Sequence, residues 1–98
     1  MDFKVIWSPS ARLDLKEIVS YIAEDNAEIA QRFGFSLIDA TKSLGSFPGK
    51  GRSVPELGSQ NIREVIFKPY RIIYRVKEAE SVIEIVRVWH AARGTPEL

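Results

Sequence analysis

The fold is decided by residues 62–90, which read IREVIFKPYRIIYRVKEAESVIEIVRVWH. β-Branched and aromatic residues fill 62–67, 70–77 and 82–89, and the breaks between them are Lys68-Pro69 and residues 78–81. Short runs of this composition, bounded by turn residues, are typical of strands that follow one another along the chain. The stretch therefore predicts a three-stranded antiparallel meander.

The two sides of the middle strand differ in chemistry. Side chains alternate between the faces of a sheet, so one side is apolar and aromatic while the other carries three cations. The first side holds Tyr70, Ile72, Tyr74 and Val76, and the second holds Arg71, Ile73, Arg75 and Lys77. In the last strand, the same alternation predicts that Ile83 and Ile85 share a side with Arg87 and Trp89.

The N-terminal half predicts a strand and two helices. Residues 3–7 form a short apolar run, and Ser8-Pro9 is a favourable N-cap with proline at the first helical position. Apolar residues at helical spacing continue to about residue 24, and a longer helix follows Asn26. Residues 48–61 hold three glycines and two prolines, which indicates a loop. The expected fold class is α+β, with the helical hairpin on one face of a four-stranded sheet.

Length and composition exclude several classes of protein. At 98 residues the chain is expected to form a single domain over 1–98, and it has no apolar run near the roughly 20 residues that span a bilayer. No cysteine and one histidine are too few ligands for a typical zinc centre. We therefore expect no metal, no cofactor, no membrane association and a cytoplasmic location, since the N-terminus lacks a signal-peptide pattern.

Basic residues concentrate in the second half of the chain. The formal net charge is only +1, but residues 50–75 hold six basic and two acidic side chains. Such a patch is compatible with an anionic partner, although a solvated strand face explains it equally well. The candidate residues for binding a target or partner are Arg52, Arg63, Arg71, Arg75, Arg87 and Arg93.

No nucleotide-binding, serine hydrolase or metalloprotease motif is present. Glu56 and His90 are the candidates for an acid and base pair that promotes attack of a ribose 2′-hydroxyl on its phosphate, with an arginine stabilising the developing charge. The alternative is structural, with Glu56 holding a loop and His90 ending a strand. Tyr70 and Tyr74 share a face with aliphatic residues, which favours core packing over base stacking.

Four segments together resemble the RelE/ParE superfamily of toxins from bacterial toxin–antitoxin modules, on its ParE-like side. They are residues 11–22, ARLDLKEIVSYI; residues 47–57, FPGKGRSVPEL; residues 70–76, YRIIYRV; and residues 85–93, IVRVWHAAR. The resemblance covers nearly the whole chain, and its specificity lies in the combination of segments.

The resemblance implies a type II toxin that inhibits growth, poisons DNA gyrase and takes part in plasmid stabilisation without turning over a substrate. It also implies a small antitoxin, encoded upstream, that folds on binding and forms a hetero-oligomer with the toxin. One alternative is a RelE-like endoribonuclease that cuts messenger RNA on the ribosome. Another is a non-toxic protein that binds its antitoxin and serves autoregulation.

The ribonuclease alternative assigns catalysis to Glu56, Arg71 and His90, which fall near the positions used by RelE-like relatives. The sequence departs from that pattern because Ala91 follows His90 where a tyrosine is expected. The lysine-rich loop of those relatives is also reduced to Lys50. We therefore favour the gyrase interpretation, which assigns no catalytic residue.

Overall fold

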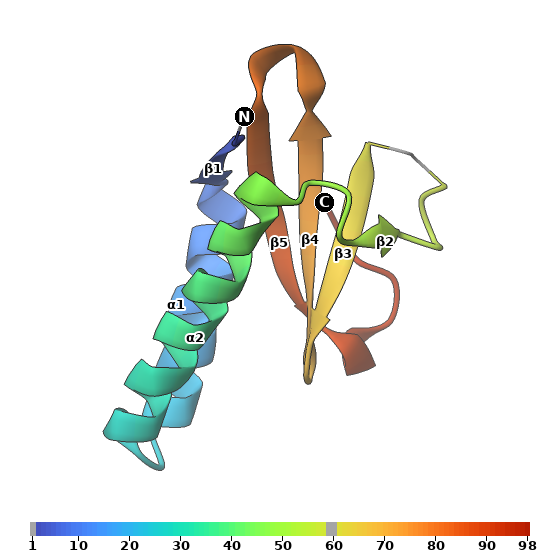
Figure 1. The fold of residues 1–98 in the computed structure, drawn as a ribbon. Helices are drawn as coiled ribbons and strands as arrows, with labels where there is room; N and C mark the ends of the chain where they lie inside the picture. The colour runs from blue at the N-terminus through green and yellow to red at the C-terminus, as the bar shows by residue number, and fades with distance from the viewer. Residues whose placement is uncertain (1, 59–60) are drawn as a thin grey trace.

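The computed structural model describes residues 2–58 and 61–98, which form a helical hairpin packed against a sheet (Figure 1). Two short 3₁₀ turns, Glu78–Glu80 and Ala91–Arg93, flank the last strand. The longer elements are β1 (Lys4–Trp7), α1 (Pro9–Ala23), α2 (Ala27–Ser46), β2 (Arg52–Ser53), β3 (Ile62–Phe67), β4 (Tyr70–Lys77) and β5 (Val82–His90).

The sheet has five strands in the order β1-β5-β4-β3-β2. β1 runs parallel to β5 and the other pairings are antiparallel. The predicted three-stranded meander is therefore confirmed, and the N-terminal strand joins the same sheet. The expected count of four strands is wrong, because β2 lies inside the predicted loop and pairs with β3 through Arg52 and Ser53. A two-residue strand in a glycine-rich segment carries no alternation pattern that would reveal it.

Both helices begin where side-chain caps are available. The Ser8 hydroxyl accepts from the Ala11 amide at 3.0 Å, and the Asn26 side chain accepts from the Ile29 amide at 3.0 Å. Each bond satisfies a backbone donor that has no partner within the helix. Gly34 brings the helices close together, since an added Cβ would lie 3.1 Å from Val19 Cγ2.

The main core lies between the hairpin and the sheet, as the sequence predicted. The helices pack on one face, mainly against β1 and β5. The core consists of the buried residues Ala11, Ile18, Leu37, Leu44, Ile72, Tyr74, Val76, Ile83, Ile85 and Val88. No helix within residues 2–58 and 61–98 is long and apolar enough to cross a membrane.

A β-bulge in β5 overturns the strict alternation expected for that strand. Ile73 of β4 faces Arg87 and Tyr74 faces Ile85, which leaves Val86 as an extra residue. Ile85 therefore points into the main core, while Arg87 and Trp89 belong to the other side. The Ser8 hydroxyl donates to the Val86 carbonyl at 3.0 Å and so satisfies the bulged backbone.

The helix-free face of the sheet carries a second, smaller core. Val54, Ile73 and Trp89 are buried there, with Ile62 packed against them. The C-terminal tail turns back beside this cluster (Figure 1): the Gly94 carbonyl accepts from Trp89 Nε1 at 3.1 Å, and Pro96 is buried. The C-terminal tail therefore packs against the helix-free face of the sheet.

Candidate functional site

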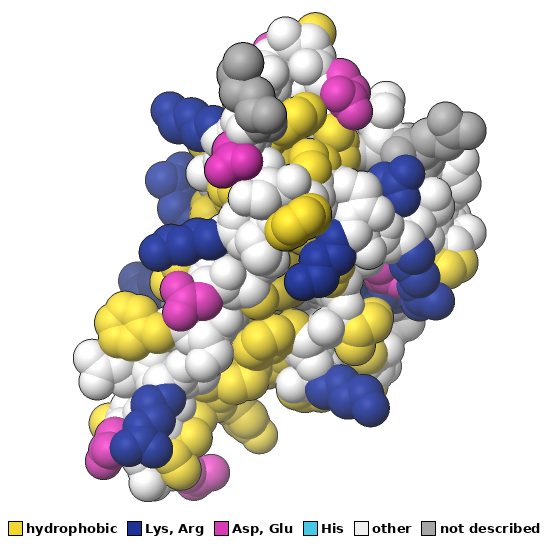
Figure 2. Space-filling view, viewed as in Figure 1, with side chains coloured by type: hydrophobic (Ala, Val, Ile, Leu, Met, Phe, Trp, Pro, Cys, Tyr) yellow, Lys and Arg dark blue, Asp and Glu magenta, His cyan; other side chains and the backbone are white. Residues whose placement is uncertain are grey.

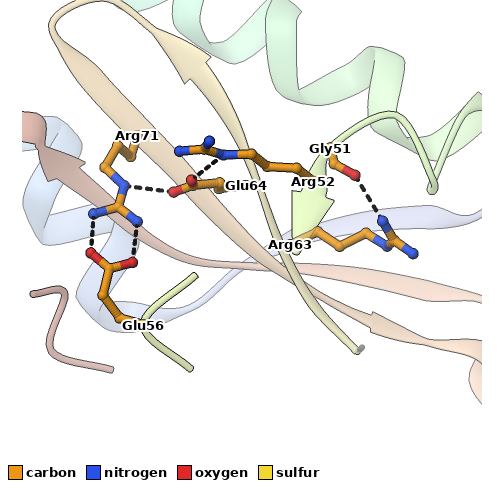
Figure 3. A network of polar contacts seen from close by, with 6 residues as sticks. All are labelled: Gly51, Arg52, Glu56, Arg63, Glu64 and Arg71. Atoms are coloured by element: carbon orange, nitrogen blue, oxygen red, sulfur yellow. Dashed lines mark hydrogen bonds and ion pairs between the residues drawn. The ribbon is translucent and has the colours of Figure 1, made fainter. Parts of the chain in front are cut away.

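Four charged side chains form a connected network on the helix-free face (Figure 3). Arg71 binds the Glu56 carboxylate through two parallel hydrogen bonds of 2.9 and 2.8 Å, and its Nε donates to Glu64. The second Glu64 oxygen accepts from Arg52 Nε at 2.7 Å. The Glu64 side chain is fully buried and that of Arg71 is 9% exposed. The network therefore ties the loop that carries Glu56 to β3 and β4.

The charges within this network cancel. Two guanidinium groups face two carboxylates, and a paired carboxylate is favoured in its ionised form. The hydrogen bond from Arg71 lowers the pKa of Glu56 from 4.5 to about 2, and the pKa of Arg71 is raised in turn, chiefly by Glu56. Arg71 is thus engaged by two carboxylates, not presented as a free cation on a solvated strand.

The loop before Glu56 is held by a separate set of bonds around Tyr74. The Tyr74 hydroxyl accepts from the Gly51 amide at 2.8 Å and donates to the Pro48 carbonyl at 2.8 Å. Burial raises the pKa of Tyr74. Glycine is required at position 51, because an added Cβ would lie 2.5 Å from the Glu64 carbonyl oxygen. Both predicted tyrosine placements therefore hold, with Tyr74 buried and Tyr70 packed against the main core.

His90 lies on the opposite face from Glu56. It is paired with Tyr70 across β4 and β5, and the two rings meet edge to face with centroids 5.3 Å apart. Tyr70 in turn contacts Phe33 of α2, so this pair points toward the helices. Arg71, the next residue along β4, points to the helix-free side and holds Glu56 there. The structure does not bring the proposed acid and base together.

His90 is also engaged locally. Its Nδ1 accepts a hydrogen bond from the Ala92 amide at 3.0 Å, which leaves Nε2 to carry the ring proton when the imidazole is neutral. A groove of about 440 Å³ opens beside it, with Asp14, Glu17, Tyr21 and Arg93 on its walls. Within residues 2–58 and 61–98, no group of three or more His, Asp or Glu side chains could hold a metal ion.

Asp14 is a structural residue that the sequence analysis missed. It is 7% exposed and accepts from Arg87 Nε at 2.8 Å, from Arg87 Nη2 at 2.9 Å and from the Val88 amide at 3.0 Å. Because β1 ends at Trp7, Asp14 supplies the acceptor for the open edge of β5. Its pairing raises the pKa of Arg87. The available signal was a lone carboxylate on the apolar face of the helix, between Ala11 and Ile18.

The remaining arginines differ in how their charge is used. Arg75 pairs with Glu84 at 3.1 Å, on the part of β5 next to β1. Arg93 stacks on Trp89, with its guanidinium carbon 4.1 Å from the ring centroid. Arg63 donates to the Gly51 carbonyl at 2.8 Å, and the described residues place no carboxylate within ion-pair distance of it. The six candidate arginines therefore do not form one continuous cationic face.

Part of the helix-facing side of the sheet is left open. The helices cover β1 and β5, so Val65, Phe67 and Tyr70 of β3 and β4 are only half-buried. Figure 2 shows hydrophobic side chains exposed between the hairpin and the strands. Phe47, which follows α2, is 65% exposed. We refer to Phe33, Phe47, Val65, Phe67 and Tyr70 as the open apolar surface.

A free strand edge adjoins the open apolar surface. β2 pairs with β3 only at Arg63 and Glu64, and in the described part of the chain no strand flanks Val65–Phe67 on its outer side. An unpaired edge presents backbone donors and acceptors to another chain. Lys50, Arg63 and Lys68 lie on the segments that border this edge. Apolar area, an open edge and cations that have no carboxylate partner among the described residues therefore occur together.

Comparison with known proteins identifies this arrangement. A family profile described as "ParE toxin of type II toxin-antitoxin system, parDE" matches residues 5–94. Toxin RelE2 of Caulobacter vibrioides is 38% identical over 91 residues, which cover 92% of this chain and 97% of that protein. The chromosomal ParDE system of Pseudomonas aeruginosa contains a chain of the same fold, with a TM-score of 0.74 at 22% identity over 90% of this chain and 95% of that one.

A second solved structure, the RelBE2 toxin–antitoxin complex of Mycobacterium tuberculosis, aligns with a TM-score of 0.71 at 18% identity, covering 92% of this chain and 99% of that one. A helical hairpin on one face of a mixed sheet, shared with these proteins, defines the RelE/ParE class of small toxins. Within that class the chain belongs to the ParE toxin family of type II toxin–antitoxin systems, which confirms the resemblance seen in the sequence.

Proposed function

We propose that this toxin inhibits growth by acting on DNA gyrase and does not cleave messenger RNA. The observation that supports this proposal is the separation of Glu56 and Arg71 from His90 by the thickness of the sheet. A general base and a general acid must both reach the reacting ribose and phosphate, at hydrogen-bond distance or through one water. Glu56 and Arg71 also neutralise each other, so neither is poised for proton transfer or for binding a phosphate.

The experiment compares the two targets side by side with the purified chain. One reaction follows supercoiling of relaxed plasmid by gyrase, and the other follows messenger RNA cleavage on translating ribosomes. The proposal expects loss of supercoiling, or trapped cleaved DNA, with intact messenger RNA. Ribosomal cleavage with normal supercoiling would favour the ribonuclease suggested by the RelE names of the relatives. Normal growth on expression of the chain alone would favour the non-toxic, autoregulatory alternative.

A cognate antitoxin is the second part of the proposed function, and we assign its binding to the open apolar surface. An antitoxin segment that folds on binding would add a strand beside Val65–Phe67 and place apolar side chains against Phe47. Lys50, Arg63 and Lys68 would favour acidic residues in that segment and increase its rate of association. The neighbouring ion-pair network contributes little to this attraction, because its own charges cancel.

Phe47→Glu tests this surface, because it replaces an exposed aromatic side chain without opening the main core. Aromatic anchors in an interface contribute about 2 kcal/mol or more, so the antitoxin affinity should fall at least about thirtyfold. Phe35→Glu is a matched control, since Phe35 is 60% exposed on the other side of α2. Calorimetric titrations that show equal losses for both variants, or none for Phe47→Glu, would contradict the assignment.

A further inference from the structure

The outward face of the helical hairpin, turned away from the sheet, carries a second apolar groove. Its lining is almost entirely aliphatic and aromatic, and its volume is about 180 Å³. Gly34 forms part of the floor, and Phe35 stands beside it with 60% of its surface exposed. We call this groove, formed by Leu15, Val19, Ala30, Gln31, Gly34, Phe35 and Ile38, the hairpin face.

Charges flank the hairpin face in an ordered way. Arg12 and Lys16 lie toward the N-terminal end of α1, and Lys42 lies toward the C-terminal end of α2, one turn beyond Ile38. We call this end of the hairpin its base and the end where the helices join its tip. Glu24 and Asp25 lie at the opposite end, where the two helices join. Figure 2 shows basic side chains along the upper left edge, and at the lower tip acidic side chains next to a basic one. The face is therefore basic at one end and acidic at the other.

Local ion pairs do not cancel this separation. Glu28 near the tip is paired with Arg32 at 2.7 Å, and Lys42 approaches Asp39 only at 3.9 Å. Among the ion pairs of the described residues, none involves Arg12, Lys16, Glu24 or Asp25. These four charges remain available to a partner. A uniformly acidic partner helix would be repelled by the acidic end of the face, and a uniformly basic one would be repelled by the basic end.

We propose that the hairpin face binds a second copy of this chain, packed antiparallel about a two-fold axis near Gly34. That arrangement puts the basic base of each hairpin against the acidic tip of the other. Lys16 and Glu24 lie one turn to either side of Ser20, so the axis brings Lys16 of each copy close to Glu24 of the other. Phe35 of each copy then fills the groove of its partner.

The available area suits a weak, concentration-dependent dimer. The 20 residues of α2 make a helix roughly 30 Å long. With two helices side by side, the face measures roughly 30 Å by 20 Å, or about 600 Å² per partner, somewhat below the typical 800 Å² of stable complexes. The open apolar surface lies on the other side of α2, so a dimer of this kind leaves antitoxin binding possible.

Sedimentation of the purified full chain tests the proposal across low to high micromolar concentration. We expect a monomer–dimer equilibrium whose dissociation constant rises at least about tenfold in Phe35→Glu. Phe47→Glu is the matched control and should dimerise like the wild type. Circular dichroism checks that both variants remain folded. A chain that is monomeric at every concentration, or a dimer lost in Phe47→Glu and kept in Phe35→Glu, would overturn the proposal.

A charge exchange tests the antiparallel geometry. Lys16→Glu and Glu24→Lys should each weaken the dimer about fivefold, as two exposed ion pairs are replaced by repulsion, and the double variant should regain wild-type affinity. Additive losses in the double variant would overturn the antiparallel arrangement.

Self-association can be tested independently of the proposed function. If the toxin were monomeric and Phe35→Glu abolished antitoxin binding, the hairpin face would belong to the antitoxin and self-association would be wrong.

Discussion

The two faces of the sheet are stabilised by different means. The helix-facing side is a continuous apolar core of helix and strand residues, centred on Leu37, Ile72 and Ile85. The helix-free side has a smaller apolar centre of Val54, Ile73 and Trp89, next to the buried carboxylate of Glu64. Apolar burial depends on area and tolerates small shifts, whereas an ion-pair network depends on the position of each atom. The helix-free side should therefore be the more sensitive of the two to the replacement of one of its polar side chains.

Arg71→Met has the largest expected effect on this comparison. It leaves Glu64 buried with only Arg52 as a cationic partner, and breaking a buried pair costs about 3–5 kcal/mol. Urea unfolding measures the loss. The double variant Arg71→Met, Glu64→Leu removes both buried charges and should be more stable than Arg71→Met alone. If the double variant were less stable than Arg71→Met alone, the favourable energy of the ion-pair network would exceed the cost of burying its charges.

Leu37→Ala tests the apolar face. The side chain is fully buried in the main core, and truncation should cost about 2–5 kcal/mol, since a cavity adds to the lost transfer energy. The loss is measured by the same urea titration and should add to that of a substitution at Glu64, because Leu37 lies in the main core and Glu64 lies on the helix-free face. Strong coupling between them would mean that the faces are not independent.

Asp14→Asn has an intermediate expected effect. The amide keeps a similar shape but loses the charge that binds Arg87, so the stability should fall by about 1–3 kcal/mol. Hydrogen exchange of the Val88 amide should also accelerate, because Asp14 is its acceptor at the open edge of β5. Unchanged exchange at Val88, measured by NMR, would contradict the proposed role of this carboxylate.

Glu56 gives the smallest effect and one that depends on pH. Its pKa falls from 4.5 to about 2 in the folded chain, so the unfolded state binds the proton more readily within that interval. The stabilisation is complete above about pH 4.5 and is lost as the pH falls toward 2. Glu56→Gln should be less stable than the wild type at neutral pH, and the difference should shrink on acidification. A constant difference between urea midpoints at pH 5 and pH 2.5 would contradict the lowered pKa.

The elements on the apolar face were predictable from the sequence because their signals are local. The Ser8 and Asn26 caps, the helical spacing of apolar residues and the three strands of the meander each depend on residues near one another in the chain. The two-residue β2 and the bulge at Val86 were not predictable, since both are set by pairing with distant strands. One inserted residue was enough to move Ile85 and Arg87 to different faces.

The candidate site was less predictable because charges were assigned without their partners. Arg71 meets Glu56 across 15 positions and Arg87 meets Asp14 across 73, and no pattern of spacing reveals either pair. A count of basic residues along 50–75 therefore overstated the free positive charge. The pleat of β4 points Tyr70 and Arg71 to opposite faces, and so places their partners, His90 and Glu56, on opposite sides of the sheet.

The most direct test of the central claim is the toxic activity of Glu56→Gln, His90→Gln and the double variant, measured at equal concentrations of folded protein. If Glu56 is a structural residue and His90 belongs to a different face, each variant should inhibit supercoiling within about threefold of the wild type, since neither transfers a proton. A positioned acid or base contributes about a hundredfold or more. A loss of that size in messenger cleavage for each single variant, with no further loss in the double, would show that the two residues act together and would contradict the account.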